Sequence, residues 1–597
     1  MIVIYAPTKI DFWIFRFLSS LGLSIYVFDK NNVAHSKSLK RARKIHLIRF
    51  DNEDKIGLLN YIDYPSEKII ENYLSSLQLD TAYRRLSRFY ERIDNLHQKL
   101  DLSLVSTFNY FSSGLVYAFY LSNRVRHNER LTIINCEISS FISHEYKIFD
   151  KQSIHLTFPV GQCITLFSTR IKSSLCKFFE KKEKNEGQRS DQSILHNQNI
   201  NLAILFHKSD EYGRLFKKEH YFSNEENSPL YWDRVAKCAV YPDDKTPSYL
   251  LPLKEVCNKT EYLRFFQVVS LLDFLRSSNQ KKRALIILFY RYLQYDAWSK
   301  IFRDSAIKNI IIDYDLLFPK ALSLALESLC IKTFAFQERP TGSLYYLING
   351  VICDFYSYSG ELWREYGENK RSILCKKPLT LGSWRNYLFE SNPIRIQDSQ
   401  FHQKVSKKKI EMKIVFLGYF LDDTNLATNT NANHRLFDYV SEVAAVFPQA
   451  LIVLRMKVLD EKTLQIASSR LGNIPNVFIS TDYDTAALSY ALCREADAIV
   501  SPQSSLAEEA LAFGKKVVFV DNLYSVNGLC SSIYPSVFKF MIAKNSVELL
   551  SLLQRIISRD KELVLSYRKI KKLLSADEMF KSQAEIPRMI TRVFGIT

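Results

Sequence analysis

Most residues of this chain whose types and spacing could do chemistry lie in its last third. The segment 498–530, AIVSPQSSLAEEALAFGKKVVFVDNLYSVNGLC, reads as a buried strand, a polar turn, a helix and a second buried strand. Ser505 and Glu508 have the S-x-x-E spacing of a capping box, which predicts a helix N-terminus. The free N–H groups and the dipole of such an N-terminus suit an anion such as phosphate. A helix cap without a ligand is the alternative interpretation.

Polar side chains also follow the preceding strands that the sequence predicts in this region. Four successive strand ends carry Asp422 and Asp423, then Arg455 and Lys457, then Asp482 and Asp484, then Gln503, Ser504, Ser505 and Glu508. Ligands of open α/β sheets bind at the carboxyl ends of the strands, so this succession predicts a ligand site. Each residue taken alone could be a turn or cap residue.

Strand and helix patterns alternate over most of the chain, which predicts an α/β fold with two Rossmann-like domains facing each other across a cleft. The strands expected in the first half are 2–5, 24–28, 131–135, 284–288, 309–312, 332–336 and 353–358. Residues 376–395 and 404–409 read as an interdomain linker, and the polar segment 180–200 as a linker or mobile loop. We therefore expect an N-terminal domain at 1–400, a C-terminal domain at 401–545 and a helical tail at 546–597.

The first half offers its own candidates at predicted strand ends. Glu338 is a candidate general base and Arg339 is a candidate anion clamp. Together with Asp313, which follows an earlier strand, they would line the cleft on the side that binds the acceptor of a transferred group. The alternative is that Glu338 and Arg339 pair with each other and that Asp313 is a turn residue.

Three of these segments resemble a known family when taken in order. GYFLDDTN (418–425), IVLRMK (452–457) and SSLAEEALAFGKKVVFVDNLYSVNGL (504–529) are similar to the capsule and surface-polysaccharide glycosyltransferases of the GT-B fold, particularly the retaining β-Kdo transferases. Those families have a Gly-x-x-x-x-Asp loop, a Lys-Pro-His-Pro motif and a final Ser-Leu-x-x-Glu-Ala-Leu-x-x-Gly-Lys-x-Val motif followed by a Tyr and a Gly-Leu. The resemblance covers about the last third of the chain and is most specific in the final motif.

The resemblance implies a role for each matching residue. Asp423 aligns with the proposed carboxylate nucleophile and Asp422 lies beside it, which would allow retention by double displacement. The nucleotide-sugar side would be formed by Gln503, Ser504, Ser505, Glu508, Tyr524, Arg455 and Lys457. The sequence departs from the pattern in one place, because Leu454 to Lys457 replace Lys-Pro-His-Pro and no histidine follows His434. An arginine can stabilise a leaving phosphate but cannot replace the proton transfer of a histidine.

The net charge of the chain indicates which kinds of partner it could bind. The 597 residues carry a net charge of +18, which favours polyanions or anionic membrane surfaces, yet no nucleic-acid-binding motif accompanies it. The ten cysteines are scattered without a C-x-x-C pair, and no signal peptide or transmembrane span is expected, since 108–121 reads as a buried helix. Asp-x-Asp occurs in IIDYD and TDYDT, but helix capping explains the second, so we expect no metal.

Two classes of function remain open. The first is a metal-independent glycosyltransferase of the cytoplasm, peripheral at the inner membrane face, that moves a sugar to a lipid-linked or growing glycan of capsule, O-antigen or lipopolysaccharide. CMP-linked Kdo is the donor that the resemblance favours, no other cofactor is expected, and a CDP-glycerol-type glycerophosphotransferase is a second enzyme reading. The non-enzyme alternative is a GT-B scaffold that only binds glycan or nucleic acid.

Overall fold

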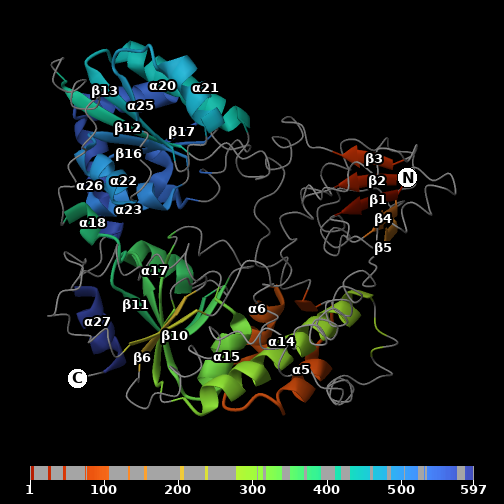
Figure 1. Cartoon of the computed structure of the whole chain (residues 1–597). Coiled ribbons are helices and arrows are strands. Elements are labelled where there is room, and N and C mark those ends of the chain that lie inside the picture. The colour runs from red at the N-terminus through yellow and green to blue at the C-terminus, as the bar shows by residue number, and fades with distance from the viewer. Residues whose placement is uncertain are drawn as a thin grey trace, which may run out of the picture.

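The structure is a computed structural model (Figure 1). It describes the backbone of strands at 2–5, 25–28, 45–48, 132–134, 154–156, 202–206 and 235–239. It also describes 74–75, 77–105, 274, 277, 279–305, 307–312, 318–338, 340, 350–368, 373–390, 410–418, 430–456, 461–480, 486–502, 504–521, 530, 534–574 and 585–595.

The described strands form three parallel sheets, which confirms the predicted α/β class. Sheet A has the order β3-β2-β1-β4-β5, where β1 is Ile2–Tyr5, β2 Ile25–Phe28, β3 Ile45–Ile48, β4 Thr132–Ile134 and β5 Ile154–Leu156. Its strands are short runs rich in Ile, Val and aromatic residues, which favour extended backbone. Three of them lie where the sequence predicts strands.

Sheet B has the order β11-β10-β9-β8-β6-β7. Its strands are β6 Leu202–Phe206, β7 Val235–Ala239, β8 Asn309–Ile312, β9 Lys332–Phe336, β10 Val351–Tyr358 and β11 Ile373–Thr380. The strand predicted at 284–288 is wrong, because ALIIL lies inside helix α14 (Asn279–Arg303). A short apolar run fits a buried helix as well as a strand, and here it belongs to a 25-residue helix.

Part of the predicted linker at 376–395 is also regular structure. Residues 376–380 belong to β11, which lies at one edge of sheet B, and helix α18 covers Tyr387–Glu390. Pro378 lies within β11, which an edge strand tolerates because it has one side without a neighbouring strand. The predicted N-terminal domain at 1–400 therefore contains the strands of two separate sheets.

Helices α5 (Asp80–Leu86) and α6 (Leu96–Val105) lie in the chain between strands of sheet A, but Figure 1 shows both of them beside α14. The buried ammonium of Lys99 lies 2.6 Å from the carboxylate of Glu327 in helix α15 (Lys320–Ser328). The ring of Tyr90 lies 4.4 Å from that of Tyr295 in α14. The segment that contains α5 and α6 therefore packs against α14 and α15.

Sheet C has the order β14-β13-β12-β15-β16-β17. Its strands are β12 Met412–Gly418, β13 Ala450–Met456, β14 Val477–Ser480, β15 Ala498–Ser501, β16 Val517–Val520 and β17 Ile542–Ala543. Its helices are α20 (Thr430–Val446), α21 (Glu461–Leu471), α22 (Ala486–Glu495) and α23 (Ser505–Phe513). Numbered within the sheet, the order is 3-2-1-4-5-6, the Rossmann arrangement. The strand and helix alternation predicted here is confirmed.

Sheets B and C share one hydrophobic core, so they form the GT-B-like pair that the sequence predicts. Helix α17 (Glu361–Glu368) meets the sheet C side where Trp363 lies 5.7 Å from Phe538 of the 3-10 helix η5 (Ser536–Met541). Phe389 of α18 stacks on Phe513 of α23 with ring centroids 4.9 Å apart.

The segment predicted as a helical tail is helical, with α25 (Ser546–Ile557), α26 (Lys561–Leu574) and α27 (Glu585–Phe594). Helix α27 returns to sheet B (Figure 1), where the ring of Phe594 lies 5.9 Å from that of Phe355 in β10. Ile586 and Ile590 of α27 are buried in the same cluster. In the described part of the chain, no helix is long and apolar enough to cross a bilayer.

Candidate functional site

The order of sheet C reverses between two neighbouring strands, β12 and β15. Phe416 of β12 pairs with Val500 of β15, so the two strands end side by side at Gly418 and Ser501. A ligand crevice forms in such folds where two connections leave the carboxyl edge in opposite directions. In the sequence, Asp422 and Asp423 follow β12, and Ser504 and Ser505 follow β15.

Gly418 is the last residue of β12, and a side chain there would require Met456 or Leu436 to shift. A Cβ at this position would lie 2.4 Å from Sδ of Met456 and 2.7 Å from Cδ2 of Leu436. The glycine that begins the Gly-x-x-x-x-Asp segment thus lets β13 and α20 approach the end of β12 closely.

Helix α23 begins at the end of β15, but the predicted capping box does not form. The N-cap is Ser504, and its side chain makes no capping hydrogen bond. The carboxylate of Glu508 is buried and accepts a hydrogen bond of 2.8 Å from the hydroxyl of Tyr534, so it does not reach back to the helix start. Ser504 and Ser505 are half-buried at the carboxyl edge of the sheet.

Phe513, Gly514 and Lys515 of the final motif form the C-terminal end of α23. Gly514 has φ 97° and receives the helix end in the left-handed conformation that suits glycine. Its N–H and that of Lys515 donate to the carbonyls of Leu511 and Ala510 at 2.9 and 2.8 Å. The glycine of the motif therefore ends α23.

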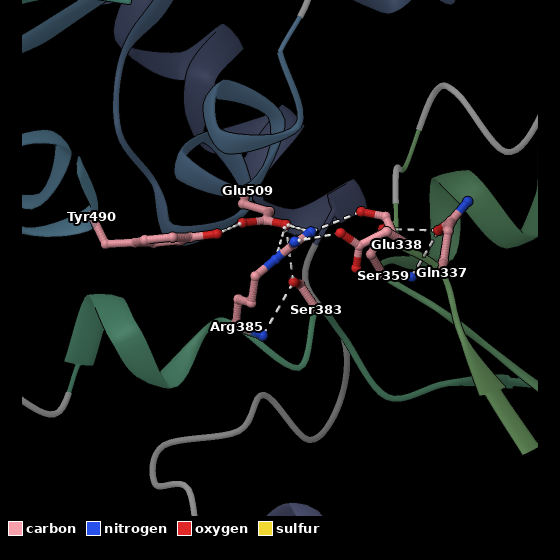
Figure 2. Close-up of polar contacts among 7 residues, drawn as sticks. All are labelled: Gln337, Glu338, Ser359, Ser383, Arg385, Tyr490 and Glu509. Atoms are coloured by element: carbon pink, nitrogen blue, oxygen red, sulfur yellow. Dashed lines mark hydrogen bonds and ion pairs between the residues drawn. The ribbon is translucent and has the colours of Figure 1, made fainter. Parts of the chain in front are cut away.

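A buried cluster joins sheet C to sheet B at the side chain of Arg385 (Figure 2). The guanidinium donates to Oε1 of Glu509 in α23 at 2.6 and 3.0 Å. It also donates to Oε1 and the carbonyl of Glu338 at 2.9 and 2.7 Å. We call Glu338, Arg385, Glu509, Tyr490 and Ser383 the Arg385 cluster.

The members of the Arg385 cluster follow strands of both sheets. Glu338 comes after β9 and Arg385 after β11, while Glu509 comes after β15. The carboxyl edges of sheets B and C therefore meet at this cluster, and Figure 2 shows Arg385 pointing between the two glutamates. Tyr490 donates to Oε2 of Glu509 at 2.5 Å, and the Ser383 hydroxyl donates to its Oε1 at 3.2 Å.

Electrostatics within the cluster are unbalanced, because one guanidinium faces two carboxyl groups that are each 2% exposed. Burial raises the pKa of the Glu509 carboxyl, and the positive charge of Arg385 opposes that rise. Glu508 and Glu509 thus both have protein partners.

Arg455 lies at the carboxyl edge of sheet C, as predicted, and is 6% exposed. Its Nε donates to the Ser489 hydroxyl at 3.0 Å and its Nη1 to the Ser480 hydroxyl at 3.2 Å. Because Leu417 of β12 pairs with Arg455, the charge lies one strand away from the β12 end.

Several predicted site residues lie outside the described residues. These are Asp313, Arg339, Asp422, Asp423, Lys457, Gln503 and Tyr524, together with both Asp-x-Asp tripeptides and the segments 108–121 and 180–200. Their roles stay predictions. In the ranges that the structure does describe, no group of three His, Cys, Asp or Glu side chains is placed to hold a metal ion.

Sequence reasoning missed Arg385, Tyr490 and Tyr534. Glu338 pairs with Arg385 across 47 positions of sequence, and no local spacing marks such a pair. The signal that existed was a polar Ser-Trp-Arg-Asn run inside the segment read as a linker.

The similarity to known proteins concerns the fold of this chain and not its activity. No protein-family model and no curated protein matches the sequence. Among solved structures, the chain is similar to UDP-GlcNAc 2-epimerase from Neisseria meningitidis bound to UDP-GlcNAc, at 12% identity and a TM-score of 0.37, over 67% of this chain and 100% of that one. It is similar to a putative UDP-N-acetylglucosamine 2-epimerase from Listeria monocytogenes at 13% identity and a TM-score of 0.40, over 67% and 97%. For the wall teichoic acid polymerase TagF the values are 10% and 0.37, over 72% and 98%.

Proposed function

We propose that this chain is a nucleotide-sugar-dependent glycosyltransferase of surface-polysaccharide biosynthesis, with its donor site at the carboxyl edge of sheet C. The observation that supports this most is the adjacency of β12 and β15 at the reversal of strand order. In the sequence, the predicted carboxylates follow β12 and the predicted serines follow β15. The Arg385 cluster, which joins the carboxyl edges of sheets B and C, supports an acceptor side opposite the donor.

The donor phosphate is proposed to bind at the N-terminus of α23. The helix has nine residues, and its Ser504 N-cap makes no side-chain capping bond, so first-turn N–H groups are available to an anion. Within the described ranges, the buried hydroxyl of Ser501, the last residue of β15, has no hydrogen-bond partner. Ser504, Ser505 and Gln503 would complete the phosphate contacts.

Positive charge is proposed to stabilise the leaving nucleotide. Arg455 lies at the same edge of sheet C, and Lys457 follows it in sequence. Cations fixed at a site from which water is excluded stabilise the charge that develops on a leaving phosphate.

Asp423 is proposed as the nucleophile, with Asp422 beside it. Its carboxylate would form a bond to the anomeric carbon as the bond to the nucleotide phosphate oxygen breaks. An acceptor hydroxyl would then displace the carboxylate, lose its proton and leave the configuration retained. The general base stays unassigned, because Glu338 is 2% exposed and engaged by Arg385.

The proposed donor sugar and acceptor are inferred from the sequence resemblance to the β-Kdo transferases. CMP-linked Kdo is the proposed donor, and a lipid-linked or growing glycan at the inner membrane face is the proposed acceptor. The structural likeness to two epimerases of UDP-GlcNAc and to a teichoic acid polymerase adds UDP-GlcNAc and CDP-glycerol to the donors worth testing.

A panel of CMP-, CDP-, UDP- and GDP-linked donors tests the proposal. The purified chain is incubated with each donor, and intact mass and released nucleotide are recorded. We expect one donor to give a mass gain that Asp423→Ala abolishes, while Asp438→Ala, a change at an exposed position of α20, retains it. Absence of binding and turnover with every donor would leave the non-catalytic scaffold as the better account.

A further inference from the structure

Helix α26 (Lys561–Leu574) has one face packed into the protein and an opposite face that is cationic. The buried residues are Leu563, Tyr567, Ile570 and Leu574. The exposed residues at i, i+4, i+7, i+8 and i+11 are Lys561, Leu565, Arg568, Lys569 and Lys572, which we call the basic stripe. This spacing lines side chains along one side of a helix, over roughly 17 Å of axis at 1.5 Å per residue.

An apolar side chain lies in the middle of the basic stripe. Leu565 is 62% exposed, one of the most exposed large hydrophobic side chains among the described residues. Ile557, at the end of the preceding helix, is 40% exposed. Four cations flank Leu565 along the stripe, and the only acidic residue of α26 is Glu562, 3.8 Å from Arg555.

We propose that the basic stripe docks the protein on an anionic lipid bilayer, with Lys561, Arg568 and Lys569 at the headgroups and Leu565 inserted between them. Charge complementarity supports a polyanionic partner, since cations near an anionic leaflet are drawn to its surface potential. The exposed leucine favours a bilayer over nucleic acid, because an apolar side chain gains from leaving water at the headgroup boundary. Amphipathic Lys and Arg side chains reach phosphate while their stems cover apolar surface.

This surface is independent of the donor site, and its test needs no nucleotide sugar. Binding is measured by sedimentation of the full chain with phosphatidylcholine vesicles and with vesicles that also contain phosphatidylglycerol. We expect binding only to the anionic vesicles, weakening as salt is added.

Two triple variants make a matched comparison. Lys561→Gln, Arg568→Gln and Lys569→Gln together should weaken binding on the order of 100-fold, at about fivefold per cation. Arg303→Gln, Lys308→Gln and Lys332→Gln together remove the same charge at exposed positions beside sheet B and should leave binding unchanged. Unaltered circular dichroism melting curves check that both variants fold.

Leu565→Ser separates a bilayer from other polyanions. It keeps the net charge and should weaken vesicle binding about tenfold through the lost apolar contact. The proposal is overturned if both triple variants lose binding equally, if the stripe variant binds as the wild type does, or if Leu565→Ser has no effect. Stronger binding of a DNA duplex than of vesicles would assign the stripe to nucleic acid and also overturn it.

Discussion

Replacing Arg385 with methionine should strongly destabilise the chain, because it leaves two buried carboxyl groups without their shared cation. Four hydrogen bonds from the guanidinium, to Glu338 and Glu509, disappear at once. Removing one partner of a buried ion pair typically costs about 3–5 kcal/mol, since the remaining charge is neither solvated nor paired. We expect a loss of about 4 kcal/mol in the free energy of unfolding.

A neutral partner should reduce this penalty. Glu509→Gln alone leaves Arg385 paired one to one with Glu338 and should cost only about 1–2 kcal/mol, mainly through weaker hydrogen bonds from Tyr490 and Arg385. In the Arg385→Met background, Glu509→Gln removes an unpaired buried charge. The double variant should therefore be more stable than the sum of the single effects predicts.

The effect should also depend on pH. Burial raises the pKa of Glu509 and Arg385 opposes the rise, so the pKa should rise further in Arg385→Met. Above the ordinary pKa of glutamate, the native state then binds a proton that the unfolded state does not. Stability of Arg385→Met should fall as pH rises through that window, more steeply than for the wild type, and Glu509→Gln should make the slope shallower.

Urea unfolding followed by circular dichroism measures these differences across pH. The matched control is Arg364→Met, because Arg364 also bridges two glutamates, Glu361 at 3.6 Å and Glu368 at 2.7 Å, but is 36% exposed. Exposed pairs contribute about 0–1 kcal/mol. If Arg385→Met cost no more than Arg364→Met, the Arg385 cluster would not hold the two sheets together as described.

Three further changes test the elements around the site by thermal unfolding. Gly514→Ala should cost about 1–2 kcal/mol, because φ 97° is strained for alanine and the new Cβ would lie 2.9 Å from Cδ of Lys571; an unchanged melting temperature would contradict this. Tyr534→Phe removes the hydroxyl that donates to buried Glu508 and should cost about 1–3 kcal/mol, whereas a neutral effect would mean that this bond contributes little. Ile590→Ala should cost about 2–5 kcal/mol because Ile590 is 0% exposed where α27 packs on sheet B; a loss below that range would show α27 to be a dispensable tail.

The sequence predicts sheet C well because its strands are buried on both faces. Runs such as 451–454 and 477–479 are continuous, apolar and bounded by polar turns, a pattern that local reasoning detects. The same reasoning fails at 284–288, where an equally apolar run belongs to a long helix. Periodicity cannot separate the two when the flanking residues are also compatible with a helix.

Some features of the candidate site could likewise be predicted from the sequence, and others could not. Strand ends and the start of α23 follow from local patterns, so the positions of Ser504 and Arg455 at the sheet edge were predictable. The buried partners were not, because Glu338, Arg385 and Glu509 come together only when two sheets pack. At Glu508 the local pattern gave a wrong prediction. The capping box needs the Glu508 carboxylate, but that carboxylate accepts a hydrogen bond from Tyr534, which lies 26 positions further along the chain.

Hydrogen–deuterium exchange with and without a nucleotide sugar tests the proposed donor site most directly. The donor that binds in the panel is added to the full chain, and exchange is followed by peptide mass spectrometry. We predict slower exchange in peptides that cover 415–425 and 501–510, with little change in β6 to β8 of sheet B. Protection confined to sheet A or sheet B, with none at the start of α23, would contradict a donor site at the carboxyl edge of sheet C.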